Sequence, residues 1–394
     1  MKRHDKLAET IPVGNLGIIA LESSREMGKK VNDYIVEWRK ERSKLNAPAS
    51  SILGYSRDTY LIESSCPRFG SGEAKGLINE TVRGDDLFLL VDVVNHSLTY
   101  KVCGRENHMS PDDHYQDLKR IIAAVGGKAR RITVIMPFLY ESRQHRRSTR
   151  ESLDCALALH ELSNMGVESI ITFDAHDPRV QNSIPLRSFE TVQPTYQFIK
   201  ALLKNIPDIK LDKEHMMVVS PDEGAMGRAV YYATLLGLDV GMFYKRRDYS
   251  RIEGGRNPIV AHEFLGADLE GKDVFIIDDM ISSGESMIDV ATELKRRNAN
   301  NIYVAATFGL FTSGMEKFDE AVEKNIISKV LTTNLVYTPE EVLKRDYYIS
   351  VDMSKYVALL IDTLNHDQSI SGLLSPTERI QDIMHKYHQS GFED

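Results

Sequence analysis

The sequence is poor in cysteine, and its few cysteines follow no recognisable pattern. Cys66, Cys103 and Cys155 are odd in number, widely separated and without the spacing of metal ligands. This pattern argues against a disulfide framework and against a zinc site. We expect ordinary reduced cysteines.

The N-terminal region lacks a hydrophobic segment long enough for a signal peptide or a membrane span. Charged residues stand between Lys2 and Glu9, and the apolar stretch from Leu16 to Leu21 is short. We therefore expect a soluble, cytoplasmic protein that does not act at a membrane.

The chain also lacks long runs of one charge sign. Its formal net charge is -8 and its pI is about 5.9, which argues against a nucleic-acid-binding protein, because such proteins need a broad basic face. Any anion site must be local. Two basic clusters, at residues 143–150 and 245–251, are each either solvated surface or part of such a site.

Short apolar runs alternate with helix-like segments along the chain. Its 394 residues, of which 42% are hydrophobic, suffice for two domains with separate cores. Runs that are apolar throughout are typical of strands buried on both faces of a parallel sheet. We predict an α/β fold of two doubly wound domains with mainly parallel sheets, and strands at residues 17–20, 87–91, 132–136, 170–173, 217–219, 240–243, 274–277 and 303–306.

Polar residues follow four of these runs directly. Because ligands of open parallel sheets bind outside the carboxyl ends of the strands, these positions are the first candidates for a site. They are Asp174-Ala175-His176, Ser220-Pro221-Asp222, Tyr244-Lys245-Arg246-Arg247 and Asp278-Asp279.

The segment Val274 to Ser286 has the features of a phosphate loop. A buried strand is followed by two carboxylates, a turn of small residues and a helix-like segment. Backbone N–H groups at the start of a helix suit a phosphate dianion, and carboxylates can accept hydrogen bonds from sugar hydroxyls or hold a metal. The alternative is a turn in which a serine only caps the helix and the acids are exposed. The candidate residues are Asp278, Asp279, Ser282, Ser283, Gly284 and Ser286.

This segment closely resembles the fingerprint of proteins that handle phosphoribosyl pyrophosphate. Over most of its length the chain resembles the ribose-phosphate diphosphokinases, also called phosphoribosyl pyrophosphate synthetases, through motifs in the same order. These motifs are Phe69-Gly70-Ser71-Gly72-Glu73, Glu80 to Gly84, Met136-Pro137-Phe138, Arg143 to Arg146, Thr172 to His176, Val218 to Gly224 with Arg228-Ala229, Tyr244 to Arg247, Asp352-Met353-Ser354 and Ser369 to Leu374.

The resemblance implies a phosphoribosyltransferase-like fold and transfer of the diphosphoryl group of ATP to ribose 5-phosphate, with Mg²⁺. It implies catalytic roles for Lys245 and Arg246, and binding of metal and ATP phosphates by His176. Asp222 would be a second metal ligand or a ribose contact. The loop residues Asp278, Asp279, Ser282, Ser283, Gly284 and Ser286 would bind ribose 5-phosphate.

The resemblance also implies a nucleotide site completed by a second subunit. Arg143 and Gln144 match the nucleotide-binding loop, whereas Phe69 and Glu73 match the segment that approaches the adenine from a neighbouring subunit. We therefore expect a homo-oligomer, either a dimer or a hexamer.

Several positions depart from the family pattern. Ser71 and His145 replace aspartates, and Ser282 and Glu285 replace an aspartate and a glycine. Insertions lie near residues 41–65 and 98–109. A non-catalytic relative that binds nucleotide or phosphoribosyl ligands is therefore the alternative to an active enzyme. A phosphoribosyltransferase would leave the Arg143 and Lys245 motifs without a purpose.

The resemblance and the apolar runs together suggest a division of the chain. We predict an N-terminal nucleotide-side domain over residues 1–190, onto which residues 345–374 pack back. A phosphoribosyl-binding domain follows over residues 191–344. Residues 375–394 are predicted to form a polar tail with a weak helix.

Overall fold

The computed structural model describes residues 7, 9–45, 47–247 and 259–390, with the side chains of residues 245–247, 259–262 and 388–390 left out. Backbone proximity groups the chain into two units, each described below by itself. The first unit contains Met1–Gln193, Asn334–Tyr337 and Asp352–Ser375. The second contains Pro194–Thr333, Thr338–Val351 and Pro376–Asp394.

The first unit is built on a five-stranded sheet in which all neighbours are parallel. Its order is β1 (Leu16–Ala20), β4 (Asp86–Leu90), β7 (Arg131–Ile135), β8 (Ser169–Phe173) and β9 (Ser188–Val192). Strand β4 is buried at every position, as its apolar run predicts.

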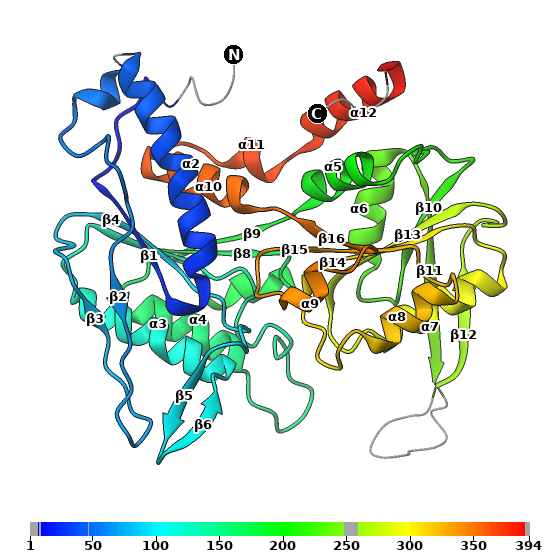
Figure 1. Ribbon diagram of the computed structural model, residues 1–394, viewed down its shortest axis with the longest axis horizontal. Helices are drawn as coiled ribbons and strands as arrows, with labels where there is room; N and C mark the ends of the chain where they lie inside the picture. The colour runs from blue at the N-terminus through cyan, green and yellow to red at the C-terminus, as the bar shows by residue number, and fades with distance from the viewer. Residues whose placement is uncertain (1–6, 8, 46, 248–258, 391–394) are drawn as a thin grey trace. The chain divides into compact units, whose positions relative to one another are not determined.

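Helices cover both faces of this sheet (Figure 1). Helices α2 (Arg25–Lys44) and α10 (Ser354–Asn365) lie on one face, and α3 (Pro111–Val125) and α4 (Asp154–Asn164) lie on the other. Short turns complete the unit, namely η1 (Glu22–Ser24), η2 (Pro48–Ser51), η3 (Pro178–Ser183) and α11 (Ser371–Leu374). The doubly wound prediction is confirmed here.

A buried polar network joins α2 to α10. Arg39 donates to Asp362 at 2.9 Å and to Asn365 at 2.7 Å, and Arg42 pairs with the same carboxylate of Asp362. The two guanidinium groups hold the pKa of Asp362 well below its usual range in spite of its burial. The insertion near residues 41–65 contributes Tyr55, whose hydroxyl accepts a hydrogen bond from Arg42.

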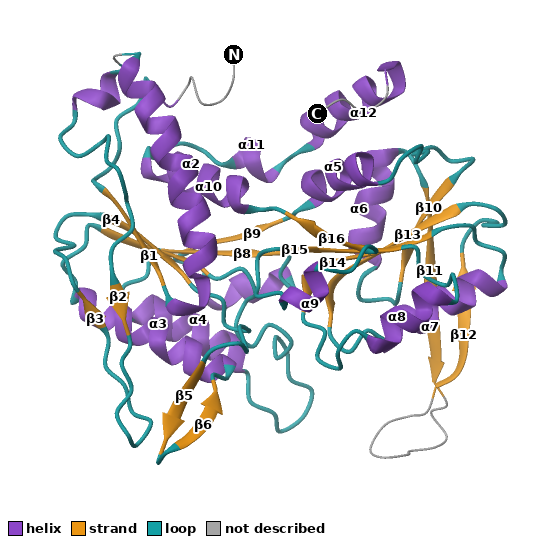
Figure 2. Cartoon of the chain, in the orientation of Figure 1, coloured by secondary structure: helices purple, strands orange, loops and turns teal. Residues whose placement is uncertain are grey.

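Two small hairpins extend from the first unit (Figure 2). They pair β2 (Ser64–Ser65) with β3 (Leu77–Ile78), and β5 (Thr99–Val102) with β6 (Arg105–His108). The second hairpin is formed by the insertion near residues 98–109.

The second unit has a seven-stranded sheet, parallel except for one edge strand. Its order is β12 (Ile259–Leu265), β11 (Asp239–Arg247), β10 (Met216–Ser220), β13 (Asp273–Ile281), β14 (Ile302–Gly309), β15 (Lys329–Thr333) and β16 (Tyr348–Val351). Strand β12 is the antiparallel one.

Helices again lie on both faces of the sheet (Figures 1 and 2). Helices α5 (Thr195–Asn205), α6 (Met226–Leu236) and α12 (Thr377–Ser390) contribute to one hydrophobic cluster. Helices α7 (Glu285–Arg296), α8 (Glu316–Glu323) and α9 (Glu340–Leu343) contribute to the other.

The division of the chain differs from the predicted one. Asn334–Tyr337 belong to the first unit and not to the predicted second domain. Residues 348–351 form β16 and pair with β15 of the second unit, so of residues 345–374 only those from Asp352 onward belong to the first unit. Residues 377–390 form α12, in agreement with the predicted helix, but the helix is not a tail, because Ile380, Ile383 and Met384 are buried in the core of the second unit. None of the helices in the described ranges is long and apolar enough to cross a membrane.

Candidate active site

The predicted site residues are divided between the two units. Phe69, Glu73, Arg143, Gln144 and His176 belong to the first unit, and Asp222, Lys245, Arg246, Asp278, Asp279, Ser282, Ser283, Gly284 and Ser286 belong to the second.

Asp278 and Asp279, called the acid pair below, lie within a strand and not after its end. Strand β13 continues to Ile281, and Asp278 pairs with Ala306 of β14, so the prediction that the strand ends at Ile277 is wrong. The ladder of hydrogen bonds to β14 outweighs the low strand propensity of aspartate. Asp279 is only 5% exposed, and its N–H donates to Asp278 Oδ1 at 2.8 Å.

Asp278 has a perturbed ionisation. Burial, and then the neighbouring Asp279 carboxylate, raise the pKa of Asp278 well above its usual range. The guanidinium of Arg228 acts in the opposite direction, with Nη1 at 3.6 Å from Asp278 Oδ1. Arg228 stands in a family motif, but the sequence alone gave it no role.

The turn after β13 depends on Gly284. This residue has a φ of +83°, and a Cβ atom there would lie 2.3 Å from the ring of Phe318. Helix α7 begins directly afterwards, so its first N–H groups, which lack partners inside the helix, point toward the loop. The Ser282 carbonyl accepts a hydrogen bond from Thr312 N–H at 2.9 Å. The arrangement suits an anion.

Glu285, the departure that conflicts most with anion binding, has a partner. Its carboxylate forms an ion pair with Lys317 of α8. A hydrogen bond from the Lys317 ammonium, together with its charge, lowers the pKa of Glu285.

Asp222 organises the loop between β10 and α6. Its Oδ1 accepts hydrogen bonds from the N–H groups of Gly224, at 2.9 Å, and Ala225, at 3.2 Å. Because β10 and β13 are parallel neighbours, this loop and the acid pair lie at the same edge of the sheet. The described residues contain no group of three His, Cys, Asp or Glu side chains that could hold a metal ion.

Lys245 and Arg246 lie on β11, opposite His262 and Ala261 of β12. Their side chains are outside the described part of the structure. Met242 pairs with Ser220 at the end of β10, so the backbone of Lys245 lies three positions further on, about 10 Å along the strand.

His176 follows β8 in a loop tied to β9. Asp174, with a φ of +40°, donates its N–H to Val192 O at 2.9 Å, and Ala175 N–H donates to Thr191 Oγ1 at 2.9 Å. The side chain of His176 is exposed at the end of this loop. A ligand can therefore reach it.

His145, which the sequence shows only as a departure, connects this loop to the nucleotide loop. Its ring centroid lies 5.3 Å from that of His176, and its Nε2 lies 3.5 Å from Asp177 Oδ2. The His145 Nδ1 atom is buried without a hydrogen-bond partner among the described residues. Arg179, more than His145, lowers the pKa of Asp177 to about 2.

The two predicted residues of the nucleotide loop differ in their surroundings. Arg143 is exposed. Gln144 is part of the loop framework, because its Nε2 donates to Ser152 O at 2.8 Å and to Arg146 O at 3.3 Å. Arg143 is therefore the better placed of the two to contact a ligand.

Phe69 and Glu73 close a tight turn. Phe69 N–H donates to Glu73 O at 2.7 Å, and Ser71 Oγ donates to Glu73 Oε2 at 2.9 Å. Phe69 is 53% exposed. The β5–β6 hairpin supports the turn, since Cys103 N–H donates to Gly70 O at 2.8 Å.

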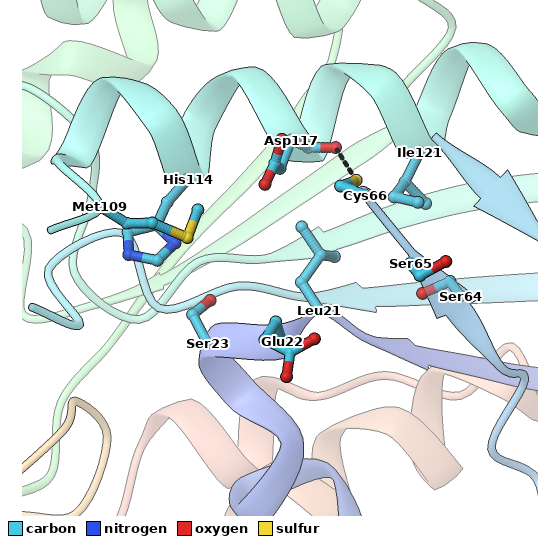
Figure 3. A pocket seen from close by; sticks show the side chains of 10 residues that line it. All are labelled: Leu21, Glu22, Ser23, Ser64, Ser65, Cys66, Met109, His114, Asp117 and Ile121. Atoms are coloured by element: carbon cyan, nitrogen blue, oxygen red, sulfur yellow. Dashed lines mark hydrogen bonds between the residues drawn. The ribbon is translucent and has the colours of Figure 1, made fainter. Parts of the chain in front are cut away.

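A small cavity in the first unit lies near the end of β1 (Figure 3). Its volume of about 20 Å³ has room for one water molecule and not for a nucleotide. Burial raises the pKa of its Cys66 thiol to about 12, so this side chain is not an activated nucleophile.

Family models match both halves of the chain. The N-terminal domain of ribose phosphate pyrophosphokinase matches residues 16–166, and the phosphoribosyl transferase domain matches residues 187–343.

Relatives and a solved structure agree with these matches. The ribose-phosphate pyrophosphokinase of Shewanella oneidensis is 30% identical over 312 residues, 78% of this chain and 89% of the relative. That of Vibrio parahaemolyticus is 28% identical over 317 residues, 79% of this chain and 91% of the relative. The fold is similar to that of phosphoribosylpyrophosphate synthetase from Mycobacterium smegmatis, with a TM-score of 0.68, 21% identity and coverage of 90% of this chain and 99% of that one.

Proposed function

The chain belongs to the ribose-phosphate pyrophosphokinase family, and from this premise we propose that it transfers the diphosphoryl group of ATP to the 1-hydroxyl of ribose 5-phosphate. The 1-oxygen bonds to the β-phosphorus, the bond between the β-phosphorus and the α,β-bridging oxygen breaks, and the hydroxyl proton is released. The products are phosphoribosyl pyrophosphate and AMP, which feed nucleotide biosynthesis.

The observation that carries this proposal is the arrangement of two aspartates on β13, the turn at Gly284 and the start of α7, which we propose as the sugar-phosphate half-site. The loop from Ser282 to Ser286 offers backbone N–H groups to the 5-phosphate, and the carboxylates of Asp278 and Asp279 accept hydrogen bonds from the ribose hydroxyls. Phosphate and sugar are then bound by adjacent parts of one segment. This orients the 1-hydroxyl for attack.

The nucleotide side is proposed to comprise Arg143, Gln144 and His176, with Phe69 and Glu73 supplied by a second copy of the chain. The exposed ring of Phe69 supports this, because an aromatic face in that position can stack on a base. Lys245 and Arg246 are proposed to stabilise the charge that develops on the phosphoryl oxygens. A homo-oligomer, dimer or hexamer, and a cytoplasmic location remain predictions.

Mg²⁺ is the proposed metal, and His176 and Asp222 are each proposed as a ligand for it. Mg²⁺ usually takes one or two protein ligands and completes its coordination with substrate phosphates and water. Asp222 fits such a metal as a ligand through one oxygen, since its Oδ1 accepts hydrogen bonds from backbone N–H groups. When bound, the ion neutralises charge on the phosphates.

Phosphorus NMR of the protein with ATP, ribose 5-phosphate and Mg²⁺ tests the reaction. We expect AMP and a new diphosphate at the 1-position of the sugar. Formation of ADP would refute diphosphoryl transfer. Binding of both ligands without turnover would instead establish the non-catalytic relative.

A further inference from the structure

Arg228 and Asp278 come together beneath the surface of the second unit. Arg228 lies in the first turn of α6 with its side chain 11% exposed, and Asp278 lies on β13 with its side chain 23% exposed. The atoms Arg228 Nη1 and Asp278 Oδ1 are 3.6 Å apart. At this burial, solvent screens the pair less than it would a surface ion pair.

The acid pair can accept hydrogen bonds from sugar hydroxyls only if a nearby cation stabilises its charge. Two adjacent carboxylates, one of them 5% exposed, repel each other and lose hydration. An ionised carboxylate is an acceptor at both oxygens, whereas a protonated carboxyl donates through one of them. Vicinal sugar hydroxyls are therefore bound better by the ionised form. Burial and Asp279 raise the pKa of Asp278, and Arg228 opposes both.

The backbone before α6 holds Arg228 in place. Asp222 Oδ1 accepts hydrogen bonds from Gly224 and Ala225, the two residues that precede the helix. Ala229, the residue after Arg228, is completely buried against the sheet. The backbone position of Arg228 is thus fixed by the start of the helix.

We propose that Arg228 is a positioning residue for sugar recognition, which holds the Asp278 carboxylate as the acceptor for the ribose hydroxyls. The proposal rests on the proposed function of this half-site. It assigns Arg228 no contact with the phosphate. Arg228 therefore affects binding of the sugar and leaves binding of the phosphate at the loop unchanged.

Calorimetric titration of the full chain with ribose 5-phosphate, and separately with inorganic phosphate, tests this role. In Arg228→Gln we expect the affinity for ribose 5-phosphate to fall about tenfold or more. The reason is that the hydrogen bonds from the ribose hydroxyls to the charged Asp278 carboxylate are weakened. The affinity for inorganic phosphate should stay the same. Arg228→Lys, which keeps the charge, should recover most of the loss.

A double-mutant cycle shows whether Arg228 acts through Asp278. The variant carrying both Arg228→Gln and Asp278→Asn should bind ribose 5-phosphate no more weakly than Asp278→Asn alone. Arg296→Gln is the matched control, because Arg296 is 74% exposed at the opposite end of α7, about 16 Å from the loop.

Three results would overturn the proposal. Additive losses in the double variant would show that Arg228 acts independently of Asp278. Equal losses for ribose 5-phosphate and inorganic phosphate would show a general structural role. If the wild-type chain binds ribose 5-phosphate no more tightly than inorganic phosphate, the proposed function is refuted, and the role of Arg228 with it.

Discussion

Lys317 and Glu285 form an ion pair at the start of α7, next to the proposed phosphate loop. A carboxylate beside a bound phosphate is repulsive unless a cation compensates it. The ammonium group of Lys317, from α8, supplies that compensation, and a carboxylate in the first turn of α7 is also favoured by the helix dipole. The departure at position 285 is therefore compatible with anion binding.

Replacing Lys317 should leave the repulsion between the Glu285 carboxylate and a bound phosphate without compensation. In Lys317→Met we expect a roughly two- to fivefold weaker affinity for ribose 5-phosphate, because both side chains of the pair are more than half exposed and their effect is screened. Adding Glu285→Gln should restore the affinity. Calorimetric titration at low and at high salt measures both.

The control for this experiment is Lys324→Met. Lys324 pairs with Glu320 at the other end of α8 and should have no effect on binding. Equal losses in the two lysine variants, or a loss that is independent of salt, would show that the charge of Glu285 is not the cause.

Gly284→Ala should destabilise the second unit strongly. The substitution places a Cβ atom at a φ of +83° and 2.3 Å from the ring of Phe318, so we expect a loss of about 2 kcal/mol or more. The loss in stability is measured by urea unfolding, from the change in the midpoint of the transition.

Gly271→Ala separates the cost of the left-handed backbone conformation from the cost of the contact with Phe318. Gly271 has a φ of +74°, but no atom lies within 4 Å of its Cβ position. It should lose only about 1 kcal/mol, the cost of the backbone conformation. Equal losses in both alanine variants would show that the contact with Phe318 is unimportant.

The apolar runs predicted eight strands of the two large sheets, including the edge strand β1, and missed the less apolar ones. Strands β9, β12, β15 and β16 escaped prediction. At the edge of the first sheet, β9 has the sequence Ser-Phe-Glu-Thr-Val, in which only Phe189 and Val192 are buried. An edge strand faces solvent on one side and needs no continuous apolar run.

The sequence predicted the candidate residues of the loop between β13 and α7, but not the cations that lie beside them. Glu285 and Lys317 are 32 positions apart, and Arg228 lies on a different βα unit from Asp278. Such pairs form only when the sheet places separate loops at one edge, and no local pattern encodes them. The same holds for His145 and Asp177.

His366 should make the first unit sensitive to acid. The ring is 1% exposed, and burial, aided by Arg39 and Arg42, lowers its pKa to about 4. Between about pH 6.5 and pH 4 the unfolded chain binds a proton at this position that the folded chain does not bind. This contribution to stability is present at neutral pH and is lost as the pH falls.

Urea unfolding at pH 7 and pH 5 of the wild type and of His366→Asn tests this effect. The wild type should lose about 2 kcal/mol more between the two pH values than the variant. The comparison between chains is essential, because burial raises the pKa of Asp92 to about 7 and that group contributes in the opposite direction. Parallel losses in both chains would contradict the role of His366.

Lys245→Ala should reduce turnover far more than binding of ribose 5-phosphate. A cation that stabilises charge developing on the phosphoryl oxygens contributes to the transition state and not to the bound sugar. Steady-state rates and calorimetric titration of the same variant measure the two quantities. Equal losses in both would refute the catalytic role.

His145 and Asp177 connect the loop of Arg143 and Gln144, the proposed nucleotide loop, to the loop of His176, so we expect the pair to affect binding of ATP. The two side chains are 14% and 11% exposed, and a carboxylate at position 145 would face that of Asp177 with little screening. In His145→Asp we expect a displaced nucleotide loop and a KM for ATP about tenfold higher, with the KM for ribose 5-phosphate nearly unchanged.

Reversing the pair identifies the cause of that change. The double variant His145→Asp with Asp177→His places the same two groups in exchanged positions and should recover much of the affinity for ATP. Arg146→Asp, at the exposed neighbouring position, controls for added negative charge in the loop. If the double variant binds ATP as poorly as His145→Asp, or if both KM values rise together, the pair does not position the nucleotide loop. Recovery only in the exchanged pair would show that the histidine at position 145 acts through Asp177.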